Sequence, residues 1–150
     1  MKKKLLIFLV ISIAYILIFP YVKTNIIDKK YIFEIEATGE KNKKSNGTEV
    51  WIDSIEADGK EMNMSNLSLT TPWENRGRLY NPGTAGTLKV IIRGKNIQIN
   101  FIQHPYSGIV KVKDPNGNVK KIDLYSDEQK VIHIISKSRM EDIYYEYMDF

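Results

Sequence analysis

The sequence predicts an all-β domain, an antiparallel β-sandwich of the jelly-roll kind, preceded by one N-terminal transmembrane helix. Two observations predict the sandwich. From Tyr31 onward, short runs of alternating apolar and polar residues are separated by turn-forming glycine, proline, asparagine and aspartate. No helical period of useful length appears in this part of the sequence. An almost unbroken apolar run near the N-terminus predicts the helix.

The apolar run extends from Leu5 to Val22 and follows three lysines at positions 2–4. At helical rise it spans roughly 27 Å, close to a bilayer core of about 30 Å. A cleaved signal peptide would have a shorter apolar region and a small-residue cleavage site, which the following residues do not supply. The sequence contains no cysteine for a lipoprotein-type attachment. We therefore favour a retained anchor over a cleaved signal peptide.

The distribution of lysines predicts the orientation of this anchor. The positive-inside rule places the lysine-rich N-terminus in the cytoplasm and the rest of the chain outside the membrane. We expect a cytoplasmic tail at residues 1–4, a transmembrane helix at 5–22, a stalk at 23–30 and an extracytoplasmic β-sandwich at 31–150. The expected location is the cell membrane, crossed once.

The formal net charge of +4 comes mainly from the N-terminal tail. Three of the 22 basic residues lie at positions 2–4, which leaves 19 basic and 18 acidic residues elsewhere, a net of +1. No arginine-rich patch stands out in the remaining sequence. We therefore expect no nucleic-acid partner.

Alternation predicts about eight strands, the number that a jelly roll needs. The runs with strand character are residues 31–37, 49–57, 87–93, 96–102, 108–113, 119–125, 130–135 and 142–148. Residues 61–69 are less regular, and 73–85 have the composition of a loop. Asn116-Gly117 supplies the positive φ angles of a tight hairpin turn. The last strand is a candidate neighbour of the first.

No constellation of catalytic or metal-binding residues is visible in the sequence. Its two histidines, His104 and His133, are far apart, and zinc sites generally need three or four closely patterned ligands. The segment that starts at Asp114 lacks the glycine and glutamate of a calcium-binding EF-hand loop. Ser107 lies three residues from His104, but no nucleophile motif frames it. We expect no enzyme activity, no metal and no cofactor.

Aromatic residues in the loops are the strongest candidates for ligand contacts. Trp73, Tyr80 and Tyr106 lie in or beside loops rich in glycine and proline, and Arg76 is close in sequence. Aromatic faces stack on the apolar faces of sugar rings, while polar groups bind the hydroxyls. These four residues are the predicted glycan contacts. The alternative for Trp73 is that it closes one end of the sandwich, and Trp51 is expected in the core.

One hairpin sequence carries a resemblance to a known family. Ser107 to Ser126 resembles a hairpin of bacterial jelly-roll modules of the carbohydrate-binding, galactose-binding-like type. The matching residues are Gly108, Ile109, Val112, Gly117, Ile122, Asp123, Leu124, Tyr125 and Ser126. The resemblance implies a jelly-roll fold and an association with glycans, but it transfers no binding residue.

These observations predict a membrane-anchored, non-catalytic binding module for a glycan or cell-envelope polymer. The alternative is a structural or accessory subunit of a membrane complex, such as one that contains a glycosyltransferase or transporter. In that case the helix and the tyrosine-rich segment 142–148 would contact a membrane-protein partner.

Overall fold

The computed structural model describes residues 2–22, 30–94, 96–137 and 144–148. The chain divides into two compact units, residues 1–30 and 31–150, and each is described by itself. The predicted stalk, apart from Lys30, lies outside the described residues.

The first unit contains one helix, α1 (Lys2–Val22), which includes Pro20. The helix covers the predicted apolar run and begins at Lys2, so lysines expected to precede the helix form its first turn. The hydroxyl of Ser12 donates to the carbonyl of Phe8 at 2.9 Å and so satisfies its polar group within the helix. Among the described residues, the structure contains no helix with the length and apolar character required to cross a membrane.

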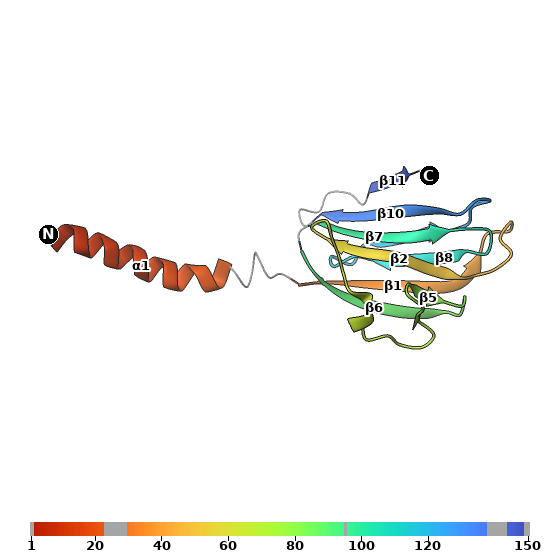
Figure 1. Cartoon of the computed structure of the whole chain (residues 1–150), viewed down its shortest axis with the longest axis horizontal. Helices are drawn as coiled ribbons and strands as arrows, with labels where there is room; N and C mark the ends of the chain where they lie inside the picture. Colours follow the sequence, from red (N-terminus) through yellow and green to blue (C-terminus); the bar gives the residue numbers. More distant parts are fainter. Residues whose placement is uncertain (1, 23–29, 95, 138–143, 149–150) are drawn as a thin grey trace. The chain divides into compact units, whose positions relative to one another are not determined.

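The second unit consists of two antiparallel sheets that pack face to face (Figure 1). The smaller sheet has the order β6-β1-β8-β9, formed by β6 (Gly86–Arg93), β1 (Lys30–Lys41), β8 (Gly108–Lys113) and β9 (Val119–Asp123). The larger sheet has the order β11-β10-β7-β2-β5-β4, formed by β11 (Tyr144–Met148), β10 (Lys130–Lys137), β7 (Asn96–Gln103), β2 (Val50–Ala57), β5 (Leu79–Asn81) and β4 (Glu74–Asn75). A short strand, β3 (Lys60–Glu61), also pairs with β2.

This architecture confirms the predicted all-β sandwich and differs from the prediction in three details. The short strands β3, β4 and β5 lie in segments that we expected to be irregular, because runs of two or three residues are too short to show alternation. The last strand, β11, pairs with β10 and not with the first strand. A short 3-10 helix at Met64–Asn66 replaces part of the irregular segment 61–69.

The hydrophobic core fills the space between the two sheets. The smaller sheet contributes inward side chains that include Phe33, Ile35, Leu88, Val90 and Val112. The larger sheet contributes inward side chains that include Val50, Ile52, Ile55, Ile99 and Phe101. Alternation alone accounts for each set, apart from one place in β2.

A bulge in β2 changes which residues face the core. The β2–β7 register runs Ile52 to Phe101 and then Ser54 to Asn100, so Asp53 is the extra residue. Because of this insertion, Ile55 faces inward opposite Ile99, whereas Ser54 lies on the outer face. The bulge thus reconciles a three-residue spacing of buried isoleucines with a strand.

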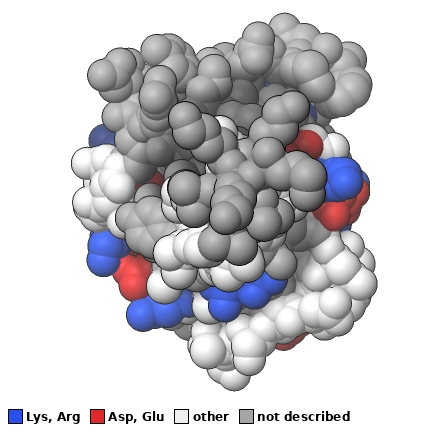
Figure 2. Space-filling model, turned by 90° about the vertical axis from the view of Figure 1, so that its left-hand side faces the viewer, with Lys and Arg blue, Asp and Glu red and all other residues white. Residues whose placement is uncertain are grey.

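The outer face of the smaller sheet carries cross-strand ion pairs. Glu34 on β1 lies 3.1 Å from both Lys89 on β6 and Lys113 on β8, and Glu36 pairs with Lys111 at 3.2 Å. On the face drawn in Figure 2, blue and red side chains also lie beside each other at both edges. Because these lysine and glutamate side chains are paired and exposed, the outer face of the smaller sheet has the character of a solvated sheet surface.

The hairpin between β8 and β9 forms at the predicted turn. The Asp114 carboxylate accepts hydrogen bonds from the backbone N–H groups of Asn116 and Asn118, at 2.8 and 3.0 Å. Of the residues in this turn, only Gly117 has a positive φ, +88°, so the turn needs one left-handed residue where we expected two. Asp114 therefore stabilises the turn, and its carboxylate is occupied by backbone and amide donors.

Candidate functional site

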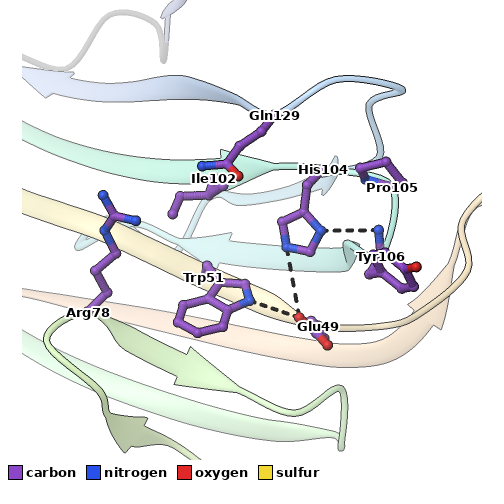
Figure 3. A pocket seen from close by; sticks show the side chains of 8 residues that line it. All are labelled: Glu49, Trp51, Arg78, Ile102, His104, Pro105, Tyr106 and Gln129. Carbon is purple, nitrogen blue, oxygen red and sulfur yellow. Dashed lines mark hydrogen bonds and ion pairs between the residues drawn. The ribbon is translucent and has the colours of Figure 1, made fainter.

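An open pocket of about 400 Å³ lies on the outer face of the larger sheet (Figure 3). Trp51 belongs to β2, where its neighbours Val50 and Ile52 point into the core, so the indole points outward. In the register, Trp51 lies opposite Ile102 on β7 and Tyr80 on β5. The residues that line the pocket are Glu49, Trp51, Arg78, Ile102, His104, Pro105, Tyr106 and Gln129.

Two loops are joined by hydrogen bonds and bring the two sides of the pocket together. The Glu49 N–H donates to the Tyr106 carbonyl at 3.1 Å, and the Gly108 N–H donates to the Glu49 carbonyl at 2.8 Å. Ser45 is 4% exposed, and its hydroxyl oxygen lies 3.1 Å from the carbonyl oxygen of Pro105 and 2.8 Å from that of Ser107, within hydrogen-bonding distance of both. These bonds hold the segment before β2 against the turn after β7, which is why residues more than fifty positions apart share one site.

Glu49 and His104 form the polar centre of the pocket. The indole Nε1–H of Trp51 donates to Glu49 Oε2 at 3.0 Å, and His104 Nε2 lies 3.9 Å from the same oxygen. The backbone N–H of Tyr106 donates to His104 Nδ1 at 3.1 Å. Since Nδ1 accepts this bond, the neutral ring carries its proton on Nε2, on the side that faces Glu49. Burial lowers the pKa of His104 from 6.5, and the Glu49 charge acts in the opposite direction.

Both arginines of this region are paired with carboxylates. Arg78 Nε lies 2.7 Å from Asp53 Oδ1, and the two side chains are 51% and 25% exposed. Figure 3 shows Arg78 on the other side of the Trp51 ring from Glu49. Arg76 pairs with Glu74 at 2.8 Å. The pocket therefore has the ion-paired Arg78 on one side of Trp51 and the carboxylate of Glu49 on the other.

A stack of aromatic and cationic groups supports Trp51. The rings of Trp51 and Tyr80 are 4.3 Å apart between centroids and tilted by 43°. The Arg76 guanidinium lies 4.2 Å from the centroid of the Tyr80 ring, in a cation–π contact. Burial and the nearby Glu49 charge raise the pKa of the Tyr80 hydroxyl above 10.0. Tyr80, which is 8% exposed, thus packs against the indole and supports its position.

The four predicted ligand contacts do not converge on one surface. Tyr106 is 54% exposed and lines the pocket. Tyr80 lies against Trp51, and Arg76 lies over the Tyr80 ring, but neither residue lines the pocket. Trp73 is 3% exposed and belongs to the core, and its indole N–H donates to the Gly86 carbonyl at 3.1 Å. A buried indole offers no face to a sugar ring, so the prediction of Trp73 as a contact is wrong and the alternative, a core position, describes it.

Trp51 lies in a different environment from the one predicted for it. We expected it in the core, but it is half-buried and lines the pocket. The signal that could have located it is its phase in β2, because an outward residue lies between the inward Val50 and Ile52. Glu49 and His104 carried no comparable signal, since only the contact between the two loops joins them.

The remaining polar groups show no catalytic or metal-binding arrangement in the described part of the chain. The buried Ser107 hydroxyl accepts the backbone N–H of His104 at 3.0 Å, so it takes part in the turn and not in a hydroxyl–imidazole pair. His133 lies on the outer face of the larger sheet, where its Nδ1 contacts Asn100 and Gln98. Within the described residues, no group of three or more His, Asp or Glu side chains is placed to hold a metal ion.

Comparison with known proteins adds no relative to this description. The chain matches no family model, no curated protein and no solved structure. The resemblance of residues 107–126 to galactose-binding-like modules therefore stays a prediction.

Proposed function

We propose that the β-sandwich is a non-catalytic module that binds a glycan or cell-envelope polymer in the pocket at Trp51. The observation that carries the proposal is the composition of this pocket. It combines the aromatic side chains of Trp51 and Tyr106 with hydrogen-bonding groups of Glu49, His104 and Gln129. Sugar rings have apolar faces edged by hydroxyls, and a site of this composition complements both.

The volume and openness of the pocket support a polymer as the ligand. About 400 Å³ lies near the lower end of the range for small-molecule sites, so a single sugar unit would occupy much of it. The pocket opens on a sheet face, and the exposed Tyr106 lies at its edge. A chain of sugars could therefore enter with one unit bound and its neighbours in solvent.

Membrane attachment through residues 5–22 belongs to the same proposal and rests on the apolar sequence alone. A tether would raise the effective concentration of a weak binding site near a polymer at the membrane surface. Fractionation of cells tests it: the full chain is expected in the membrane fraction after a carbonate wash, and a chain released by the wash would contradict the attachment. The jelly-roll module of galactose-binding-like type is the proposed relationship of the sandwich.

An array of bacterial cell-envelope glycans tests the binding function. The full chain is applied in a detergent without a sugar head group, so that the detergent does not compete for the pocket. We expect binding to at least one glycan, and Tyr106→Ala is expected to weaken it about 2- to 12-fold through loss of an aromatic contact. The matched control is Ile91→Ala, because Ile91 is 56% exposed on the smaller sheet and Tyr106 is 54% exposed.

Two results would contradict the binding function. One is a folded chain that binds no glycan on the array. The other is glycan binding that Tyr106→Ala and Trp51→Ala leave unchanged, because the ligand would then bind somewhere else on the protein.

A further inference from the structure

We infer that the pocket selects a glycan with free, protonated amino groups, and that the Glu49 carboxylate binds the ammonium group beside Trp51 and Tyr106. The inference rests on the proposed function, because it names the class of glycan that the same pocket takes. It follows from the balance of charge around Glu49.

Among the described residues, Glu49 accepts a hydrogen bond but is paired with no lysine or arginine. Among the described residues that line the pocket it is the single carboxylate, and its side chain is 35% exposed. Its Oε2 accepts the neutral indole N–H of Trp51 at 3.0 Å. In the described part of the chain, no lysine or arginine forms an ion pair with it. The carboxylate thus retains an acceptor oxygen and its charge for a ligand.

The nearest ionisable group does not neutralise this charge at neutral pH. His104 Nε2 lies 3.9 Å from Glu49 Oε2, beyond a direct hydrogen bond. The ring is held in its neutral form by burial and by the Tyr106 N–H that donates to Nδ1. His104 therefore places a polar N–H, and no net positive charge, beside the carboxylate.

The nearby arginines have their own anionic partners. Arg78 is bound to Asp53 at 2.7 Å, and Arg76 is bound to Glu74 at 2.8 Å. The charge of each arginine is thus compensated by its own carboxylate, and the negative charge of Glu49 would repel a carboxylated or phosphorylated sugar. The local charge therefore disfavours acidic glycans.

An amino sugar satisfies the aromatic and the acidic parts of the pocket together. Its ring has an apolar face for the aromatic side chains, and its ammonium group can donate charge-assisted hydrogen bonds to Glu49. The indole of Trp51 and the phenol of Tyr106 also favour a nearby cation through their π faces. N-acetylation removes the charge from the nitrogen, so the acetylated sugar loses both electrostatic contributions.

Titration calorimetry with three oligosaccharides of equal length tests this selectivity. The probes are oligomers of glucosamine, of N-acetylglucosamine and of galacturonic acid, measured with the full chain below the pKa of the sugar amine. We expect the glucosamine oligomer to bind at least about 10-fold more tightly than the acetylated one. Raised ionic strength is expected to reduce this preference.

Glu49→Gln is the decisive variant, because it keeps the size of the side chain and removes its charge. It is expected to reduce the affinity for the glucosamine oligomer by at least about 10-fold relative to the affinity for the acetylated oligomer, and so to abolish the preference. Glu36→Gln is the matched control, since Glu36 has a similar side-chain exposure of 41% and lies on the outer face of the smaller sheet. The control is expected to retain the full preference.

The outcomes separate this inference from the proposed function. If the glucosamine and N-acetylglucosamine oligomers bind with equal affinity, and Glu49→Gln changes neither affinity, the inference is overturned while the glycan-binding function stands. Tighter binding of the galacturonic acid oligomer, or of a lysine-rich peptide, would overturn it as well. If none of the oligosaccharides binds and the glycan array is also blank, the proposed function fails and the inference fails with it.

Discussion

Gly108 offers a sharp test of how the two loops around the pocket are joined. It begins β8, and a Cβ atom at this position would lie 2.4 Å from the carbonyl oxygen of Thr48 and 3.0 Å from that of Glu40. Its own N–H is bonded to the Glu49 carbonyl at 2.8 Å. The obstacle to Gly108→Ala is therefore backbone on both sides, which cannot rotate away as a flexible side chain could.

The expected cost of Gly108→Ala is about 2–3 kcal/mol, at the upper end of overpacking penalties, because a backbone segment must shift. Replacing glycine by alanine in a compatible backbone conformation stabilises a protein by up to about 1 kcal/mol, because it lowers the conformational entropy of the unfolded chain. A net decrease in the free energy of unfolding therefore reports the steric clash. At about 4 °C per kcal/mol for a domain of this size, the melting temperature should fall by about 8–12 °C. The displaced Thr48 precedes Glu49, so ligand affinity is expected to fall as well.

Urea unfolding followed by tryptophan fluorescence measures this change in the free energy of unfolding. Gly117→Ala is the control, since Gly117 has a φ of +88° and no atom within 4 Å of the added Cβ. It is expected to cost about 1–2 kcal/mol through backbone strain alone and to leave the pocket intact. A Gly108→Ala protein within 0.5 kcal/mol of the parent would falsify the close approach of the two loops.

Two further predictions concern Trp73 and His104. Trp73→Ala is expected to lower the free energy of unfolding by about 3–5 kcal/mol, because a fully packed indole leaves a cavity, and a loss below 1 kcal/mol in urea unfolding would argue against its core position. Burial lowers the pKa of His104, so the folded protein binds fewer protons than the unfolded chain, and the stability present above pH 6.5 declines as the pH falls towards the folded pKa. His104→Gln should remove this decline, which urea midpoints measured across that range can check. The carboxylates of Glu34 and Glu40 have pKa values that lysine partners lower from 4.5, so they lose their contribution only in more acidic solution.

The fold class was predictable because alternation is a local property of the chain. Residues 96–102 alternate strictly in the sequence, and β7 covers them with Ile97, Ile99 and Phe101 buried. The turn at Asp114 was predictable for a similar reason, since the bonds that form it join residues within the turn. The strands β4 and β5 were not, because they are too short to show a period, and β5 depends on its pairing with the distant strand β2.

The candidate site was less predictable, because its residues come from separate parts of the chain. Tyr106 was expected at a ligand site from its loop, and the structure places it in the pocket. Glu49 was expected only as the start of a strand. Its position beside His104 depends on hydrogen bonds between two loops, which no local pattern encodes.

Alternation in the sequence was sufficient to predict a β-sandwich from Tyr31 onward, because it specifies which face of each strand is buried. The burial of Trp73, in a segment with the composition of a loop, is visible only in the folded protein. The phase of β2 indicates that Trp51 faces outward, between the inward Val50 and Ile52, whereas the burial of Trp73 depends on contacts made by distant segments. Trp73 is enclosed by the core and bonded to Gly86, whereas Trp51 lies on the outer face against Tyr80 and Glu49.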